Sequence, residues 1–444
     1  MLCNVLNWLF EKYDDNHIGY CILRNYEKLP EVNIGNDIDI LIDYKDIEKN
    51  ELILKLMCKE LGLTCIRIAK RQYVHQWYFI KQGCPEFKTL QLDFQFDGEW
   101  NGNIYLKGDY ILDNRISYKN FYIPRKSNEA LILLFASLIW GGFVKEKYNN
   151  RIYDLVNNDY EEFYKILRSS IGDYSTVIID NIKNNKMKKC EKLVKELRKS
   201  IKKSSIKNYG LIFTLVKKIK FYLHELKIRI KPPGISIVVL GSDGVGKSTF
   251  INGMKEILKR YFKEEFFCLR HSRPRFLKDP GDYIYKKEKG INTININSRD
   301  NVKKPNNMIL SFVRLIYYTL DYIIGYIIVF MKPLRKTGVV ILDRYYYDFF
   351  VDPERNRMNL PQFIYTIFYL FIPKPNIVIY LDAEPEVIYS RKQELEIVEI
   401  KKQREKYRKL SEKYAFHIID ANNSIDCMID KFEKLLVTYI SINL

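Results

Sequence analysis

One glycine-rich stretch carries the most specific chemical pattern in this sequence of 444 residues. Residues 241–248 read GSDGVGKS and fit the pattern G-x-x-x-x-G-K-[ST] at every fixed position. Glycines allow consecutive backbone N–H groups to face a phosphate, while the lysine and the hydroxyl suit the outer phosphate oxygens and a magnesium ion. The pattern therefore predicts a loop that binds the phosphates of a nucleotide.

The surrounding sequence has the element order that such a loop requires. The apolar run at 235–240 predicts a strand buried on both faces, and apolar residues recur at helical spacing from Phe250 to Tyr261. We expect Lys247 to neutralise phosphate oxygens and the Ser248 hydroxyl to occupy a Mg²⁺ position. The predicted nucleotide-binding residues are Gly241, Ser242, Asp243, Gly244, Val245, Gly246, Lys247, Ser248 and Thr249.

A second polar group follows another apolar run. Asp343 comes directly after the run at 339–342, where a carboxylate can orient Mg²⁺ and its water ligands. Arg344 follows, and a guanidinium there suits bidentate capture of a second phosphate. The alternative is a local ion pair at the end of a strand. Because a phosphate-binding loop is predicted on the same sheet, we favour a functional role for both residues.

Basic residues also gather after the apolar run at 376–381. A helix ending near Arg391 is followed by a charged hinge and by a long helix that carries Arg404 and Arg408. A mobile basic lid of this kind would neutralise transition-state charge and exclude water, whereas the alternative is a charged surface hairpin. The candidate catalytic residues are Lys247, Asp343, Arg344, Arg391 and Arg404.

The elements that would position these residues form one predicted α/β domain at 233–444. Its strand-like runs are separated by helical stretches, which predicts a doubly wound parallel sheet. Ligands bind such sheets beyond the carboxyl ends of the strands, where the polar residues collect. The predicted strands are 235–240, 266–270, 339–342, 376–381 and 415–419.

The predicted N-terminal domain, residues 1–124, carries a second candidate site. Asp37 and Asp39 point to the same side of a predicted strand, and Asp93 stands in another strand-like run at 90–96. Two carboxylates on one strand face are unfavourable unless solvent or a cation meets them. The three aspartates are therefore candidate Mg²⁺ ligands for phosphoryl or nucleotidyl transfer, and the alternative is a strand-end pair in a scaffold domain.

This N-terminal pattern resembles the nucleotidyltransferase superfamily of the DNA polymerase β type. That family has a Gly-Ser pair before its D-x-D and a third Asp on a later strand. Here Arg24-Asn25 takes the place of the Gly-Ser pair. The resemblance implies a nucleotidyltransferase-like α+β fold for residues 1–124.

The composition indicates a folded chain with an uneven charge. Hydrophobic residues make up 47% of the sequence, and its eight Cys include no C-x-x-C pair, so we expect real cores, reduced thiols and no structural metal site. The N-terminus lacks a signal-peptide pattern, and we expect a cytoplasmic protein. A nearly apolar run at 315–331 contains Asp321 and is short of a membrane span, which predicts a buried helix of a soluble domain.

Much of the net charge of +19 lies between residues 183 and 231, which hold 17 Lys or Arg and three Glu. This segment belongs to a predicted helical connecting region at 125–232, which ends where the KPPG of 231–234 stops the helix. A solvated helix face is the simplest explanation, and peripheral contact with an anionic membrane is the alternative. No nucleic-acid-binding signature accompanies the charge, so we expect no nucleic-acid partner.

The motif at 241–249, the triplet Asp343-Arg344-Tyr345 and the basic lid together resemble thymidylate kinase and its relatives among the nucleoside monophosphate kinases. The resemblance covers residues 235–444 and implies a kinase that uses ATP and Mg²⁺. Two segments depart from the parent pattern, the long polar stretch at 273–307 and the charged extension of the triplet. Together they resemble a divergent branch with an extra N-terminal domain, some members of which are associated with surface-polysaccharide genes.

The resemblance also implies roles for single residues. Lys247 and Ser248 would hold ATP and its metal, and Asp243 would lie near the sugar of the acceptor. Asp343 and Arg344 would handle the metal and the acceptor phosphate, and the lid arginines would stabilise the transferring group.

Several functions therefore stay open. The leading one is transfer of the ATP γ-phosphoryl group to a nucleoside monophosphate or another small phosphorylated acceptor. A sugar or sugar-phosphate kinase is the alternative, and a sugar hydroxyl would need Asp348 or Asp352 to accept its proton. A bifunctional nucleotidyltransferase-kinase, a low-turnover nucleotide switch and a homodimer are also kept open.

Overall fold

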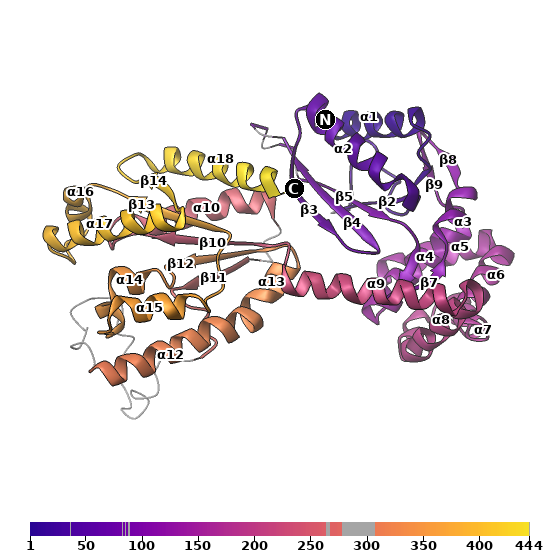
Figure 1. Cartoon of the computed structure of the whole chain (residues 1–444). Helices are drawn as coiled ribbons and strands as arrows, with labels where there is room; N and C mark the ends of the chain where they lie inside the picture. The colour runs from indigo at the N-terminus through magenta and orange to yellow at the C-terminus, as the bar shows by residue number, and fades with distance from the viewer. Residues whose placement is uncertain are drawn as a thin grey trace. The chain divides into compact units, whose positions relative to one another are not determined.

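The computed structural model divides the chain into two units, unit 1 at 1–227 and unit 2 at 228–443 (Figure 1). The predicted boundary at 124/125 falls inside unit 1, because apolar side chains on both sides of it, such as Leu23 and Leu131, share one buried core. The structure thus groups the predicted helical region with the N-terminal part. The residues that it describes are 1–35, 37–81, 83–84, 86–87, 89–262, 267–277 and 307–443.

Unit 2 is built on a five-stranded sheet in which neighbouring strands are parallel (Figure 1). The strand order is β11-β12-β10-β13-β14, so the strand before the glycine-rich loop lies at the centre. This confirms the predicted parallel α/β sheet. The strands are β10 (Ile235–Leu240), β11 (Phe267–His271), β12 (Val339–Asp343), β13 (Ile377–Asp382) and β14 (His417–Asp420).

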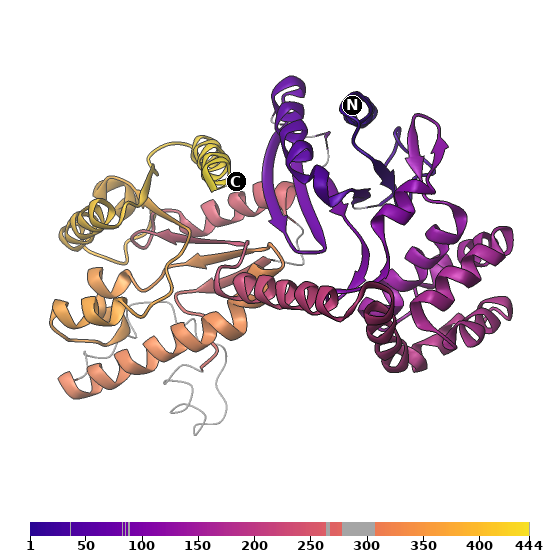
Figure 2. The same ribbon diagram turned by 45° about the vertical axis from the view of Figure 1, so that its right-hand side comes forward.

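Helices cover both faces of this sheet. Figures 1 and 2 show α10 and α18 on one face and α12, α14 and α15 on the other. The second group packs with strand residues such as Val238, Leu342 and Tyr380 in one buried cluster. The helices are α10 (Lys247–Tyr261), α12 (Met308–Gly325), α13 (Met331–Arg335), α14 (Asp348–Val351), α15 (Gln362–Tyr369), α16 (Pro385–Arg391), α17 (Ile397–Tyr414) and α18 (Ile425–Asn443), with the short turns η6 (Tyr326–Phe330) and η7 (Pro353–Asn356).

The apolar helix predicted at 315–331 is present but is covered on one face only. Leu315 and Asp321 are fully buried, whereas Leu320 on the outer face is 45% exposed and Ile327 is 62% exposed. The prediction of a buried helix is therefore wrong for the outer face. Among the described residues, 308–335 is the one helical stretch long and apolar enough to cross a membrane. Of its most apolar window of 18 residues, 33% is buried. Length and composition alone are weak evidence for a span, and the cytoplasmic location stays a prediction.

Unit 1 contains a mixed five-stranded sheet in the order β1-β2-β5-β4-β3. Strand β2 runs parallel to β5 and antiparallel to β1, and its register places Asp39 directly beside Asp93. The strands of this sheet are β1 (Tyr20–Ile22), β2 (Ile38–Ile42), β3 (Thr64–Lys70), β4 (Val74–Ile80) and β5 (Leu90–Gln95).

Unit 1 also contains helices that come before, between and after the strands of this sheet in the sequence. Helices α1 (Leu2–Asp15) and α2 (Ile47–Leu61) pack on each other and share an apolar core with the strands. After the sheet, α4 supplies eight apolar residues to a second core, which residues from α5 to α8 complete. These helices are α4 (Lys126–Gly141), α5 (Asn149–Asn158), α6 (Tyr160–Ile171), α7 (Tyr174–Lys183) and α8 (Val194–Tyr209). Helix α9 (Leu211–Ile230) follows them and extends past residue 227.

Candidate active site

The predicted phosphate-binding loop, residues 241–248, connects β10 to the first turn of α10. Gly244 has φ +88°, and a Cβ there would lie 2.9 Å from the Cβ of Lys392, so both backbone conformation and space favour glycine. The first six predicted nucleotide-binding residues form the loop. Lys247, Ser248 and Thr249 begin α10, whose N-terminus favours anions.

Lys247 is buried inside this loop. Its ammonium group donates hydrogen bonds to the carbonyl oxygens of Gly241 at 2.9 Å and Ser242 at 2.8 Å. Burial lowers the pKa of Lys247 to about 8, and the like charge of Arg344 contributes in the same direction. The lysine is thus a cation held in a dry site, where an anionic ligand would interact with it more strongly than in water.

Asp343 lies at the end of β12, next to the loop in space. The parallel register pairs it with Val239 of β10 and with His271 of β11. Its Oδ2 lies 3.2 Å from His271 Nδ1, whereas its buried Oδ1 has no hydrogen-bond partner within the described part of the chain. Burial alone would raise the pKa of Asp343, but His271 and the charge of Lys247 lower it. The unpaired oxygen is free to accept a cation or its water ligands.

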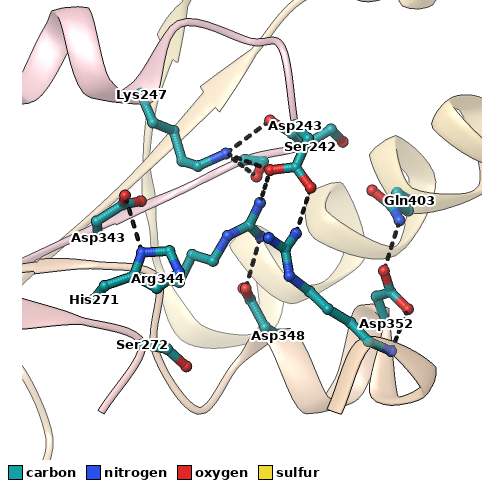
Figure 3. A network of polar contacts seen from close by, with 12 residues as sticks. Ser242, Asp243, Lys247, His271, Ser272, Asp343, Arg344, Asp348, Asp352 and Gln403 are labelled. Atoms are coloured by element: carbon teal, nitrogen blue, oxygen red, sulfur yellow. Dashed lines mark hydrogen bonds and ion pairs between the residues drawn. The ribbon is translucent and has the colours of Figure 1, made fainter. Parts of the chain in front are cut away.

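Arg344 is the centre of a buried ionic network (Figure 3). Its guanidinium donates to Asp348 Oδ2 at 2.8 Å and to Oδ1 of Asp243 in the phosphate-binding loop. Arg344 is 4% exposed; burial disfavours its charge, but the two carboxylates raise its pKa above the usual value. A second arginine, Arg355, pairs with the other oxygen of Asp243. The carboxylate of Asp243 therefore contacts two guanidinium groups. Burial would raise the pKa of Asp243, but these positive charges hold it well below the usual range.

Asp348 is occupied on both oxygens. Its Oδ2 accepts from Arg344, and its Oδ1 accepts from the Tyr407 hydroxyl at 2.9 Å. The other proton-acceptor candidate, Asp352, accepts from the backbone N–H of Arg355 and from Gln403, both at 3.2 Å (Figure 3). Both aspartates hold neighbouring structure in place.

The predicted lid corresponds to α16, a short connection and α17. Arg391, the last residue of α16, donates to the backbone carbonyls of Ala421 at 3.1 Å and of Val245 in the phosphate-binding loop at 3.4 Å. Arg404 and Arg408 of α17 both bind Asp382 at the end of β13, at 2.8 and 2.7 Å. In this structure the lid arginines are thus held by protein acceptors around the carboxyl ends of the strands.

The three aspartates of unit 1 also lie together. The ligand atoms of Asp37, Asp39 and Asp93 are all within 4.8 Å of one another. Asp39, however, already pairs with Arg24 at 2.5 Å, and both oxygens of Asp93 accept hydrogen bonds from the amides of Gln76 and Gln91 at 2.8 Å. Burial raises the pKa of Asp93 to about 7, and the negative charge of Asp39 adds to this effect.

A cavity of about 290 Å³ adjoins these aspartates and is lined by Arg24, Asp39 and Asp93, among others. The cavity and the aspartate group belong to unit 1, whereas the phosphate-binding loop belongs to unit 2.

Sequence reasoning missed the roles of three residues in unit 2. His271 is the last residue of β11, Arg355 lies in the charged extension of the Asp343-Arg344-Tyr345 triplet, and Tyr407 lies on α17 between Arg404 and Arg408. The Arg355 to Asp243 pair joins residues 112 positions apart, and no local periodicity reports such a contact. The sequence indicates these residues only by their positions, because each follows a predicted strand or lies on a helix near one.

Comparisons with known proteins point to one family. Residues 277–431 match the family model for thymidylate kinase. A probable thymidylate kinase 1 from Saccharolobus solfataricus is 25% identical over 208 residues, which are 45% of this chain and 95% of that protein. The crystal structure of thymidylate kinase from Ehrlichia chaffeensis matches 46% of this chain and all of that chain, at 15% identity and a TM-score of 0.31.

The family match contains Asp343, Arg344, Asp348 and the predicted lid. The loop at 241–248 precedes the matched residues in the sequence and follows β10, which pairs with the strand that ends in Asp343. Unit 2 of this chain is therefore a P-loop kinase domain of the thymidylate kinase type, and the protein is an ATP-dependent kinase.

Proposed function

We propose that unit 2 transfers the γ-phosphoryl group of ATP to a nucleoside monophosphate, with dTMP the first acceptor to test. The observation that carries this proposal is the convergence of Arg344 and Arg355 on Asp243 of the phosphate-binding loop. Two guanidinium groups beside the nucleotide loop suit an acceptor that itself carries a phosphate. The family match supports nucleotide substrates, and the acceptor is the new part of the proposal.

The chain's own residues account for positioning and charge neutralisation. Lys247 can exchange its two loop carbonyls for phosphate oxygens of ATP, at the positive end of α10. Arg344 is already fixed by Asp243 and Asp348, so its guanidinium needs little reorganisation when the acceptor phosphate arrives. Phosphoryl transfer requires little else from the protein.

A magnesium ion fits the residues that are present. The buried Oδ1 of Asp343 has no partner within the described residues, and the Ser248 side chain is exposed at the start of α10. A carboxylate and a hydroxyl are the donor set that Mg²⁺ prefers when it also keeps several waters. The ion would neutralise charge on the phosphate oxygens during transfer.

The occupied carboxylates support a phosphorylated acceptor over a free sugar. A sugar hydroxyl needs a general base, but both oxygens of Asp348 accept hydrogen bonds from Arg344 and Tyr407. A phosphate acceptor already carries its nucleophilic oxygen and needs no base. We also propose that Arg391 and Arg404 exchange their present acceptors for phosphate oxygens when the lid closes.

Production of ADP from Mg·ATP tests the proposal against a panel of acceptors: dTMP, UMP, CMP, GMP, sugar phosphates and free sugars. Turnover with dTMP should be lost in Lys247→Ala and Arg344→Ala. It should persist in Lys259→Ala, which removes a 40% exposed lysine from the same helix. Turnover with free sugars alone would refute the phosphate-acceptor proposal. ATP binding without turnover on any acceptor would favour the nucleotide switch.

A second candidate function is nucleotidyl transfer by unit 1. The parallel register of Asp39 and Asp93 and the grouping of both with Asp37 favour it, because two such carboxylates can share divalent cations. Release of pyrophosphate that depends on Mg²⁺ or Mn²⁺, is lost in Asp39→Asn and persists in Lys247→Ala would support it. Arg24 now neutralises Asp39, so Arg24→Gln should tighten Mn²⁺ binding measured by calorimetry. Unchanged Mn²⁺ binding in both variants would exclude a cation at this site.

A further inference from the structure

Helix α9 carries an apolar face that points away from the core of unit 1. The helix packs inward through a narrow stripe that includes Thr214 and Phe221, which are 1% and 7% exposed. On the opposite side, seven apolar side chains between residues 212 and 226 are 44% to 79% exposed. These are Ile212, Leu215, Val216, Ile219, Tyr222, Leu223 and Leu226.

The exposed apolar side chains form one continuous surface, which we call the α9 face. At 3.6 residues per turn they cover an arc of roughly 120° around the helix axis. A stripe of this width normally faces a protein core, and the same width is typical of helices that lie in a membrane interface. Isolated exposed apolar residues need no explanation, but seven on one side of one helix do.

Basic residues border the α9 face on both sides. On the same helical projection Lys218 lies at one border, and Lys220 and Lys227 lie at the other. The acidic residue of this helix, Glu225, is turned toward unit 1 and pairs with Arg71 at 2.9 Å. The surface of α9 that faces away from unit 1 is therefore apolar in the middle and cationic at its edges.

We propose that the α9 face binds an anionic lipid surface, with the helix lying parallel to the membrane plane. The apolar side chains would enter the boundary between headgroups and acyl chains, and the lysines would extend to lipid phosphates. The segment 183–231, with 17 Lys or Arg against three Glu, would add attraction to the negative surface potential. This inference does not depend on the acceptor of the kinase.

Charge decides between lipid and the other occupants of such a face. A second copy of this chain would bring two cationic helices together, and like charges in contact disfavour association. Residues 232–444 also hold more basic than acidic residues, 34 against 25, so they offer no complementary charge either. An anionic lipid surface offers negative charge to the lysines at the borders of the α9 face and an apolar interior to its central side chains.

Sedimentation of the full chain with lipid vesicles tests the proposal. Vesicles of phosphatidylcholine mixed with phosphatidylglycerol should bind the protein, vesicles of phosphatidylcholine alone should bind it much less, and added salt should weaken binding. Lys220→Gln/Lys227→Gln should lower the partition coefficient about tenfold or more, since each basic residue near an anionic surface contributes about a factor of five. Ile219→Ser/Leu223→Ser should lower it by a similar factor, because it removes apolar side chains that would enter the boundary between headgroups and acyl chains.

Two matched controls separate the α9 face from general effects. Leu52→Ser removes an apolar side chain that is 66% exposed on α2, and Lys413→Gln/Lys434→Gln removes two exposed charges from unit 2. Both controls should bind vesicles like the wild type.

Three outcomes would overturn the proposal. The first is equal or absent binding to both kinds of vesicle. The second is a dimer in analytical ultracentrifugation that Ile219→Ser/Leu223→Ser dissociates, which would assign the face to a second copy. The third is salt-sensitive binding of RNA with loss of binding in the lysine variant alone.

Discussion

Substitution of Asp348 by Asn tests whether a buried carboxylate fixes Arg344 for the reaction. Asp348 is 3% exposed, and its two oxygens accept from Arg344 at 2.8 Å and from Tyr407 at 2.9 Å. The amide keeps one acceptor but turns the other oxygen into an NH₂ group, which then faces a guanidinium or a phenol. With its oxygen toward Arg344, the amide can donate to the Tyr407 hydroxyl oxygen, so the main loss is the negative charge that pairs with Arg344.

The expected loss of stability follows from these contacts. A hydrogen bond to a charged group contributes about 1.5–3 kcal/mol, and the neutral amide keeps only part of the ion pair with Arg344. Arg344 keeps Asp243 as a second partner, so the full cost of breaking a buried ion pair, about 3–5 kcal/mol, is not reached. We expect unit 2 of the Asp348→Asn variant to lose about 2–4 kcal/mol of unfolding free energy.

The tryptophan residues provide an internal control for this measurement. All four lie in unit 1, at positions 8, 77, 100 and 140. Denaturation followed by tryptophan fluorescence therefore reports on unit 1, while circular dichroism reports on both units. The substitution should shift the circular dichroism transition of unit 2 and leave the fluorescence transition in place.

The same variant should also be slow. With Arg344 less firmly held, we expect kcat for the phosphoryl acceptor to fall about tenfold to a hundredfold while the KM for ATP changes little. Tyr407→Phe removes only the hydrogen bond that a hydroxyl donates to the Asp348 carboxylate, which should cost about 1.5–3 kcal/mol with a smaller effect on kcat. A change in unit 2 stability below about 0.5 kcal/mol, with unchanged kcat, would refute the positioning role.

Three further predictions concern other parts of the chain. Burial, with the charge of Lys70, lowers the pKa of His75 from 6.5 to about 4, so the folded state favours the neutral ring. The unfolding free energy of unit 1 should therefore fall by about 2 kcal/mol as the pH falls from 7 to roughly 5. His75→Gln should reduce that loss in unfolding followed by fluorescence. Gly244→Ala should weaken ATP binding about tenfold or more in calorimetry, because φ is +88° and the new Cβ would meet Lys392; wild-type affinity would contradict this. Asp321→Leu removes the buried partner of Arg273 at 2.6 Å, and unit 2 should lose about 3–5 kcal/mol by circular dichroism, whereas a neutral effect would show that the pair is dispensable.

Local sequence patterns were sufficient for the sheet of unit 2. Apolar runs of strand length, with helical periodicity between them, predicted all five strands and the loop at 241–248. Asp343 could be predicted because a carboxylate after a buried strand lies at the carboxyl edge of the sheet whatever the distant contacts are.

Contacts between distant segments could not be predicted in this way. Arg344 was expected to face a phosphate, and the structure shows that it also pairs with Asp243, which lies 101 positions away in the sequence. The outer face of α12 shows the same limit. Its composition indicated burial all round, but the position of neighbouring elements decides which face is covered.

Unit 1 shows what periodicity can and cannot establish about a site. Alternation along β2 correctly placed Asp37 and Asp39 together, and Asp93 on a strand. The parallel pairing of β2 with β5, and the contact of Arg24 with Asp39, depend on topology and appear only in the structure. Whether these aspartates are catalytic stays a proposal.

The most direct test of the account is to identify the product formed from γ-labelled ATP and dTMP by mass spectrometry. We expect transfer of the label to the acceptor, giving dTDP, with loss of transfer in Lys247→Ala and Arg344→Ala. Label found only in inorganic phosphate, or transferred only to an unphosphorylated sugar, would contradict the proposal that the arginines around Asp243 serve a nucleoside monophosphate.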